Sequence, residues 1–238
     1  MVSLFHRLSR SPAPPLLWAL LCLTARLPAS DTLFVEDFSE NLHSNWNLFG
    51  DPLPIRCDSM GLPPPCFDNN GDAMYTSGAI SRASYHCAGG LVLESDMYVT
   101  SNPRGAWISG GLGLAFTDQV VYGTSGVPTY HIGITYAYLG EKNWGNPHLQ
   151  GLIRFIVKCE EERDEVMTPH FNDFLDGWHR FRIEIAPDMT VSFHLDDSLA
   201  YVSVLELPPG GDSLSVVLGD RSNSWGRVFH DNVIVRRP

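Results

Sequence analysis

The chain has 238 residues, of which 44% are hydrophobic and 18% charged, and its 27 acidic residues outnumber 16 basic ones. The resulting net charge of −11 argues against a surface for nucleic acid or anionic lipid, since both require basic patches. The only lysines are Lys142 and Lys158, so no polybasic segment exists. An acidic chain of this kind suits neutral ligands or bound cations.

Residues 1–30 have the pattern of a secretory signal peptide. A basic start with Arg7 and Arg10 precedes the apolar run Leu16–Leu23, which is shorter than the ~20 residues that a membrane-spanning helix needs. We therefore expect a secreted, extracellular protein without membrane insertion. The remaining residues, 31–238, have the length of one domain. Because the leader holds three of the 16 basic residues and no acid, 13 remain against 27 acids, a net charge of −14.

Strand patterns follow one another beyond the leader, separated by turns rich in proline and glycine. In chain order the predicted strands are residues 33–38, 90–99, 110–116, 131–138, 152–158, 179–185, 191–195, 199–204, 213–218 and 228–235. The first and last of them each place an acid among apolar residues, and we expect these two strands to pair. No stretch sustains a helical period of 3.6 residues. The sequence therefore predicts an all-β fold, a two-sheet antiparallel β-sandwich.

Two smaller features refine this prediction. Glycines alternate with Leu112 and Leu114 in residues 110–116, which indicates a central strand that another backbone approaches closely. Trp107 and Trp178 stand in strand-like contexts, so we expect both in the core.

Several segments resemble the concanavalin A-like jelly roll, the fold of laminin-G-like lectin modules and of glycoside hydrolase family 16. They are residues 34–38 followed by Trp46, residues 90–96, residues 177–183 with the hairpin that follows, and residues 228–233. The resemblance covers nearly all of residues 31–238 and implies a jelly roll whose terminal strands pair. It is specific for fold and weak for function.

The hydrolase family uses a strand motif E-x-D-x-x-E, in which two acids act as nucleophile and acid/base about 5 Å apart. Glu94 and Asp96 match its first two acids, but Val99 stands in the last position. Without that proton donor a glycosidase loses its general acid. The resemblance therefore implies binding without catalysis, with Glu94 and Asp96 lining a binding groove or an open sheet face.

Aromatic rings and polar groups that suit a saccharide occur on one strand and in two polar loops. Sugars rest their C–H faces on rings, while carboxylates and amides bind their hydroxyl groups. The candidate carbohydrate-binding residues are Glu94, Asp96, Tyr136, Tyr138, Asn143, Trp144, Arg221 and Trp225. The alternative for the loop tryptophans is that they pin long loops by packing.

Calcium is the expected cofactor. In jelly rolls of the resembling type an Asp of the closing strand, here Asp231, joins oxygens near the first strand to hold a structural ion. Asp37 on the opening strand is its predicted neighbour, and the oxygen-rich turn at residues 68–72 adds Asp72. Strand alternation places Val233 on the face of Asp231, where an unpaired acid is costly. The alternatives are an Asx turn that satisfies its own backbone and a hydrogen-bonded structural Asp231.

Four cysteines remain after the leader: Cys57, Cys66, Cys87 and Cys159. An even count in a secreted chain predicts two disulfides with three possible pairings. Of these we prefer Cys57–Cys66, which would close a proline-rich loop, with Cys87–Cys159. A zinc site is the alternative, but the short spacings that it needs are absent.

These observations predict a secreted, non-catalytic domain that binds a carbohydrate or a glycoprotein. A glycoside hydrolase or polysaccharide lyase of the same fold is the first alternative, and an extracellular adhesion domain without a sugar site is the second. Acids and rings along a concave sheet would favour the enzyme, and an exposed apolar patch would favour adhesion.

Overall fold

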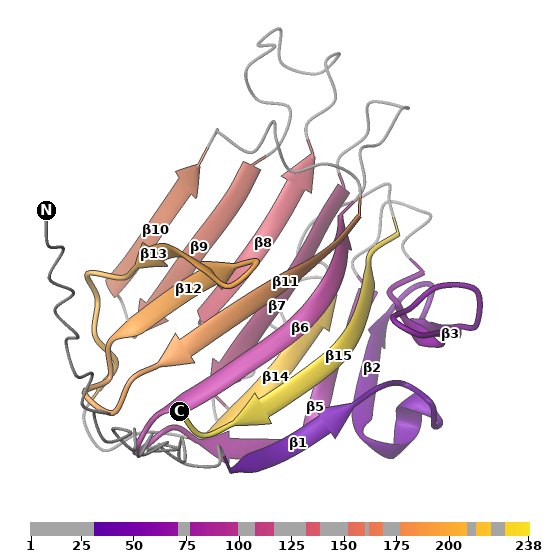
Figure 1. Ribbon diagram of the computed structural model, residues 1–238, viewed down its shortest axis with the longest axis horizontal. Helices are drawn as coiled ribbons and strands as arrows, with labels where there is room; N and C mark the ends of the chain where they lie inside the picture. The colour runs from indigo at the N-terminus through magenta and orange to yellow at the C-terminus, as the bar shows by residue number, and fades with distance from the viewer. Residues whose placement is uncertain are drawn as a thin grey trace, which may run out of the picture.

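The computed structural model describes residues 31–70, 77–99, 108–116, 132–138, 152–159, 162–168, 177–208, 213–219 and 227–238. These residues form 15 strands, one short 3-10 helix, η1 (Leu42–Ser44), and no α-helix. The strands make two antiparallel sheets that pack face to face (Figure 1), so the predicted β-sandwich is confirmed. The predicted leader lies outside the described residues. No helix within them is long and apolar enough to cross a membrane.

Sheet A contains eight strands in the order β13-β12-β11-β6-β15-β4-β3, with β1 also paired to β15. Its strands are β1 (Thr32–Glu36), β3 (Ile55–Cys57), β4 (Cys66–Asp68), β6 (Leu91–Val99), β11 (Gly177–Ile185), β12 (Val191–Leu195), β13 (Ser198–Val202) and β15 (Phe229–Arg236).

Sheet B contains seven strands in the order β10-β9-β8-β7-β14-β5-β2. Its strands are β2 (Trp46–Gly50), β5 (Ser77–His86), β7 (Ile108–Phe116), β8 (Ile132–Tyr138), β9 (Leu152–Cys159), β10 (Glu162–Thr168) and β14 (Ser213–Gly219).

The terminal strands pair as the sequence predicts. β1 and β15 run antiparallel, with Val35 opposite Ile234 and Glu36 opposite Val233 (Figure 1, indigo and yellow). β15 also pairs with β6 and β4, so it lies at the centre of sheet A. The first and last segments of the domain are thereby fixed together.

The predicted meander is present as β11, β12 and β13. Asp196 and Asp197 link the last two strands, and both have positive φ angles, 47° and 63°. A two-residue turn with this geometry matches the right-handed twist of a hairpin, and aspartate tolerates it better than most residues. The sequence Asp-Asp-Ser at this point therefore fixes the register of the edge strand β13.

The core lies between the sheets and follows the alternation of each strand. Phe181, Ile183 and Ile185 of β11 are fully buried, while the residues between them are partly exposed. Across the interface the rings of Phe155 and Phe193 lie 5.3 Å apart. Burying a side chain of this size contributes roughly 1.5–3 kcal/mol, so the interface between the sheets is the main source of stability.

Gly110 in β7 shows why glycine is needed in this central strand. A Cβ atom at this position would clash with the side chain of Val228, which leads into β15 of the facing sheet. The close neighbour at Gly110 is thus a side chain of the facing sheet and not the backbone that the glycine pattern predicted.

On one side of the sandwich, the carboxylate of Asp164 in β10 ties the edges of the two sheets together. It accepts hydrogen bonds from the hydroxyl groups of Tyr201 (2.8 Å) and Ser203 (2.7 Å) and from the backbone N–H of Val204 (2.9 Å). Desolvation raises the pKa of Asp164, but these hydrogen bonds outweigh it, so the pKa lies below its usual value. The edge strand β13 is thereby held in place.

On the opening strand, the buried acid is Glu36 rather than its neighbour Asp37. One carboxylate oxygen of Glu36 accepts the backbone N–H of Phe38 at 2.8 Å, and the other accepts Asn45 Nδ2 at 2.8 Å and Trp46 Nε1 at 3.0 Å. Phe38 has a φ of 56°, an uncommon angle for an aromatic residue. Glu36 therefore holds the sharp exit from β1 against the start of β2.

Replacing Glu36 with Gln should lower the free energy of unfolding by about 2–3 kcal/mol, because the amide NH2 cannot accept the hydrogen bonds that one carboxylate oxygen now receives. Urea denaturation followed by tryptophan fluorescence measures this loss. The control is Glu40→Gln at an exposed acid nearby, which should change stability by about 0.5 kcal/mol or less. Equal effects of the two substitutions would contradict the role given to Glu36.

Candidate functional site

Glu94 and Asp96 lie on the outer face of sheet A, pointing away from the core. Both are buried despite their charge, because arginines of the neighbouring strands cover them. Glu94 Oε1 lies 2.7 Å from Arg236 Nη2 of β15 and 4.0 Å from Arg182 Nη1 of β11. Glu94 is therefore held in an ion-pair network that spans three strands.

Asp96 has the more specific set of partners. Arg180 Nε and Nη2 donate to its two oxygens at 2.9 and 3.0 Å, which is a bidentate pair. Asn232 Nδ2 donates to Asp96 Oδ2 at 2.9 Å. Hydrogen bonding to Asp96 is the first cause that raises the pKa of Arg180. Asp96, Arg180 and Asn232 thus form a fixed cluster of hydrogen-bonding groups.

Three aromatic rings follow this cluster on the same face. The ring of Tyr98 meets Trp178 edge-on at 5.5 Å and Phe229 edge-on at 6.1 Å. The guanidinium of Arg227 lies 5.3 Å from the centre of the Phe229 ring. Tyr98 and Trp178 are only partly buried, and they pack with Met60 against the pair Cys57 and Cys66.

The strand register explains why the rings and the polar cluster meet. Tyr98 pairs with Trp178 and Phe229, and Asp96 pairs with Arg180 and Asp231. Residues two apart in a strand share a face, so rings and charges form two adjacent rows. We call this set the ring face. It consists of Asp96, Tyr98, Trp178, Arg180, Phe229 and Asn232.

The structure brings together only part of the predicted carbohydrate site. Glu94 and Asp96 share one sheet face. Tyr136 is 4% exposed and belongs to the core between the sheets, so its prediction as a ligand-binding residue is wrong. It lies on the same side of β8 as Ile132 and Ile134, which strand alternation turns inward.

The other five predicted carbohydrate-binding residues lie outside the described part of the chain, wholly or in their side chains. Tyr138 is the last residue of β8, but its side chain is outside the described part of the chain. The other candidates outside the described residues are Asn143, Trp144, Arg221 and Trp225.

Sequence reasoning missed most of the ring face. Trp178, expected in the core, instead packs, partly buried, against the small cluster of Cys57, Cys66 and Phe229 on the outer face. Trp107, also expected in the core, lies outside the described residues. Strand alternation could have revealed the rings of Trp178 and Tyr98. Trp178 lies two residues from Arg180, and Tyr98 lies two and four residues from Asp96 and Glu94, so each ring points to the same face as the charged residues. The contribution of Asn232 had no signal, since it depends on a bulge in β15.

That bulge lies between Asp231 and Ile234, and Asn232 has a φ of 48°. It turns Val233 into the core, so the expectation that Val233 shares the face of Asp231 is wrong. Asp231 is buried beneath Leu62 and accepts the backbone N–H groups of Leu62 and of Asn232 (2.7 Å).

The predicted calcium ligands have other partners. Burial raises the pKa of Asp231, its hydrogen bonds lower it, and the charges of Asp96 and Asp37 raise it further. Asp37 is exposed and accepts the N–H of Ser39 at 3.0 Å. Asp72 lies outside the described residues. Within the described ranges no three His, Cys, Asp or Glu side chains are grouped to hold a metal ion.

Cys57, Cys66, Cys87 and Cys159 are all buried in the structure. Cys57 and Cys66 face each other across the β3–β4 pair, which is compatible with the preferred pairing. Burial raises the pKa of the Cys66 thiol, with the nearby Cys57 as a further cause. Oxidation of the four cysteines stays a prediction.

Thiol titration tests that prediction directly. Protein collected from the culture medium and denatured without reductant should show no free thiol, because an oxidising compartment favours disulfides. The same sample after reduction should show the four thiols of Cys57, Cys66, Cys87 and Cys159. Two or more free thiols before reduction would refute the pairing.

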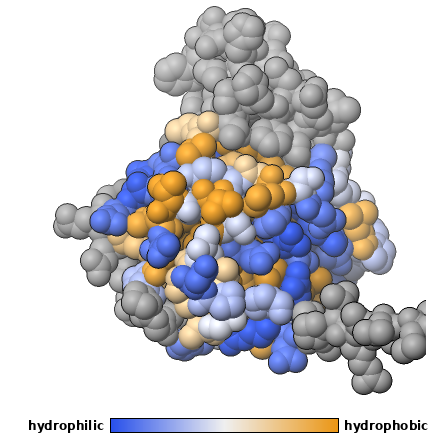
Figure 2. All heavy atoms as spheres, turned by 60° about the vertical axis from the view of Figure 1, so that its left-hand side comes forward, coloured by the Kyte–Doolittle hydropathy of each residue, from blue (hydrophilic) through white to orange (hydrophobic). Residues whose placement is uncertain are grey.

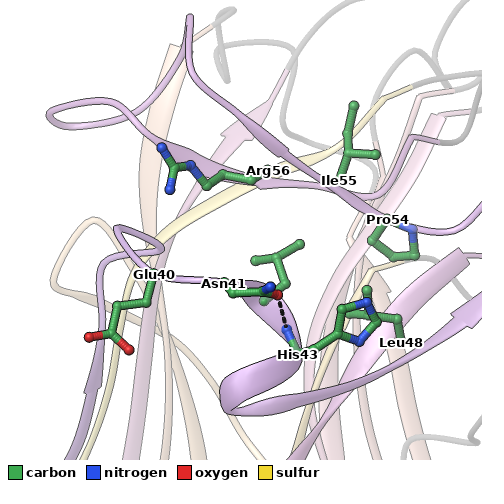
Figure 3. Close-up of a pocket in the computed structure, with 8 residues that line it drawn as sticks. Glu40, Asn41, His43, Leu48, Pro54, Ile55 and Arg56 are labelled. Atoms are coloured by element: carbon green, nitrogen blue, oxygen red, sulfur yellow. Dashed lines mark hydrogen bonds between the residues drawn. The ribbon is translucent and has the colours of Figure 1, made fainter.

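A separate cavity of about 390 Å³ lies beside η1, between β2 and β3 (Figure 3). Its lining residues are Glu40, Asn41, Leu42, His43, Leu48, Pro54, Ile55 and Arg56. The Arg56 guanidinium is already bound by Asp58 Oδ1 at 2.9 Å and by the Ser39 carbonyl at 2.8 Å. The imidazole of His43 is the one ring among these lining residues, which include no Trp, Tyr or Phe, whereas the ring face gathers three large rings, so we place the candidate saccharide site there.

No protein-family model matches the chain, and no curated protein matches its sequence. Solved structures match its fold. The carbohydrate recognition domain of Emp47p has a TM-score of 0.57 at 10% identity, covering 85% of this chain and 94% of that chain. A family 16 glycoside hydrolase, an endo-glucanase from Bacteroides ovatus, has a TM-score of 0.57 at 10% identity, covering 85% and 99%.

The globular domain of T. cruzi calreticulin has a TM-score of 0.56 at 13% identity, covering 87% of this chain and 88% of that chain. Identities this low establish the fold alone. The chain has a concanavalin A-like jelly-roll fold, as the resemblance in its sequence implies.

Proposed function

We propose that this chain is a secreted, non-catalytic carbohydrate-binding domain whose sugar site is the ring face. The observation that carries the proposal is the row formed by Tyr98, Trp178 and Phe229 beside the cluster of Asp96, Arg180 and Asn232. Rings next to fixed carboxylate, guanidinium and amide groups are the combination that saccharides require.

The contacts within the polar cluster suit a preorganised site. The bidentate pair and the amide hydrogen bond hold Asp96 in one orientation before any ligand arrives. Binding therefore costs little side-chain entropy. Arg180 keeps 41% of its side chain exposed, so it can still donate to a hydroxyl oxygen. The net charge of −14 for residues 31–238 favours neutral sugars over acidic ones.

Catalysis fits this arrangement less well. Guanidinium groups hold both Glu94 and Asp96 as hydrogen-bond acceptors, whereas a general acid must donate a proton to the leaving group. Val99 still stands at the position of the third motif acid. The endo-glucanase likeness supports only the fold, so a hydrolase or lyase remains the alternative.

A glycan array of neutral oligosaccharides tests the proposal. Binding should weaken at least tenfold in Trp178→Ala, because the loss of one stacking ring costs about 1.4 kcal/mol or more. Asp96→Asn, which keeps the side-chain shape, should weaken binding as well. The control Leu33→Ala changes an exposed residue of β1 and should leave binding unchanged.

Two results would overturn the sugar site: no glycan retained by the unmodified chain, or Trp178→Ala binding as tightly as that chain while both remain folded. Release of new reducing ends from a bound polysaccharide would instead establish the hydrolase alternative.

Calcium is a second, separate proposal for this domain. An ion between Asp231 and Asp37, with Asp72 as a further ligand, would relieve the repulsion that contributes to the raised pKa of Asp231. The backbone donors that already occupy Asp231 are the argument against it.

Melting curves recorded with calcium and with a chelator test whether Asp231 binds an ion or is a hydrogen-bonded structural residue. If the ion binds, calcium should raise the melting temperature, because a ligand at a hundredfold excess over its dissociation constant stabilises the folded state by about 2.7 kcal/mol. Asp231→Ala should abolish the difference, and Asp31→Ala, an exposed acid, should preserve it. Identical curves with and without the chelator would make Asp231 a hydrogen-bonded structural residue.

A further inference from the structure

β13 is an edge strand of sheet A whose outer surface is apolar. Leu199, Val202 and Val204 are 61%, 43% and 87% exposed, and residues 198–205 contain no charged side chain. Figure 2 turns this side of the molecule forward and shows apolar side chains gathered among hydrophilic ones. We call residues 198–204 the β13 edge. In a chain with 18% charged residues, a neutral exposed strand of this kind is a feature to explain.

The backbone of the β13 edge offers a place for another strand. The N–H of Ser203 donates a hydrogen bond to the carbonyl of Val191 in β12. The backbone N–H and C=O groups of every second residue along this segment therefore point toward β12. Val202 is paired with Ser192 at the position between, where both backbone groups of an antiparallel strand point outward. The N–H and C=O of Val202 thus face the open edge.

The corresponding edge of sheet B is protected, unlike β13. β10 begins with four charged residues, Glu162, Arg163, Asp164 and Glu165. Charges on an edge strand prevent another strand from pairing with it. The carboxylate of Asp164 also accepts hydrogen bonds from Tyr201, Ser203 and Val204. These bonds hold β13 in an extended conformation with which another strand can pair.

Charge at the two ends of β13 indicates which partner fits. The acids Asp196 and Asp197 precede the strand, Glu206 follows it, and all three are exposed. Asp196 also lies 2.8 Å from His179 Nδ1 and accepts the backbone N–H of Arg180 at 3.0 Å. A second copy pairing antiparallel about Tyr201 would bring Asp196 of one copy opposite Glu206 of the other. Like charges placed opposite each other are destabilising, and both copies are acidic overall. A strand with basic ends would meet these acids favourably.

We propose that the β13 edge binds an extended peptide segment of another protein, with alternating apolar residues flanked by Lys or Arg. The segment adds a strand to sheet A through the backbone of Val202, and its apolar side chains cover Leu199 and Val204. This site is distinct from the ring face, so its occupation does not depend on sugar binding.

The probe is a fluorescently labelled peptide of alternating valine and threonine with two lysines at each end, measured by anisotropy against the whole domain. It should bind at least tenfold tighter than the same peptide with glutamates at its ends, which is a difference of about 1.4 kcal/mol. A version with proline at its centre, which cannot pair along the strand, should not bind.

Val204→Glu should weaken binding of the basic peptide about tenfold or more, since it places a charge among the apolar contacts. Val204 is almost fully exposed, so this substitution leaves folding intact. The matched control is Val35→Glu, which makes the same change at a valine 58% exposed on another edge strand, β1, and should bind normally.

Three results would overturn the proposal. They are no binding of the basic peptide, equal binding of the acidic peptide, and equal effects of Val204→Glu and Val35→Glu. Sedimentation of the domain alone supplies a further test. A dimer that Val204→Glu dissociates would make a second copy the occupant of the β13 edge.

Discussion

The bulge in β15 is the constraint on which the rest of sheet A depends. Before it, Phe229 and Asp231 point outward, and after it Val233 and Val235 point into the core. In a regular strand these four side chains would all point to the same face, because every second residue does so. The extra residue at the bulge reverses the direction, so the first two point outward and the last two point into the core. Asn232, at the bulge, reaches Asp96 and the carbonyl of Leu62 with its amide. Without the bulge the ring face would lose this amide.

The carboxylates on the outer face of sheet A, Glu94 and Asp96, are buried in ion pairs with arginines rather than exposed to solvent. Buried carboxylates are costly unless donors surround them, and here arginines of the neighbouring strands β11 and β15 supply those donors. The same pairs that make Glu94 and Asp96 tolerable also hold them rigidly. A face of this kind is poor at proton transfer and well suited to binding, which is the physical basis for preferring a lectin-like role over hydrolysis.

The two edges on one side of the sandwich show opposite solutions to the same problem. β10 carries charged residues, whereas β13 exposes Leu199, Val202 and Val204. Asp164 joins these edges, so the apolar strand is rigid as well as exposed. The sheet face and the sheet edge are therefore two separate surfaces, for which we propose a ring-stacking ligand and an extended apolar strand, respectively.

Alternation of apolar residues by itself determined the fold class and the β11–β13 meander. These features depend on neighbours in sequence or on the general requirement to bury one face of every strand. Alternation also carried the information that Tyr136 faces inward with Ile132 and Ile134, although residue chemistry suggested a ligand role. Local pattern is thus a better guide to the direction of a strand residue than its chemical type.

Only the tertiary structure decided the composition of the ring face. Arg180 and Asn232 lie 84 and 136 residues from Asp96, on strands whose register with β6 no local pattern specifies. The bulge that aims Asn232 and the loop of Leu62 that buries Asp231 depend on contacts between three strands and a turn. A sequence fixes which residues alternate along each strand, but the alignment of one strand with another results from packing of the whole sandwich, and that alignment creates the site.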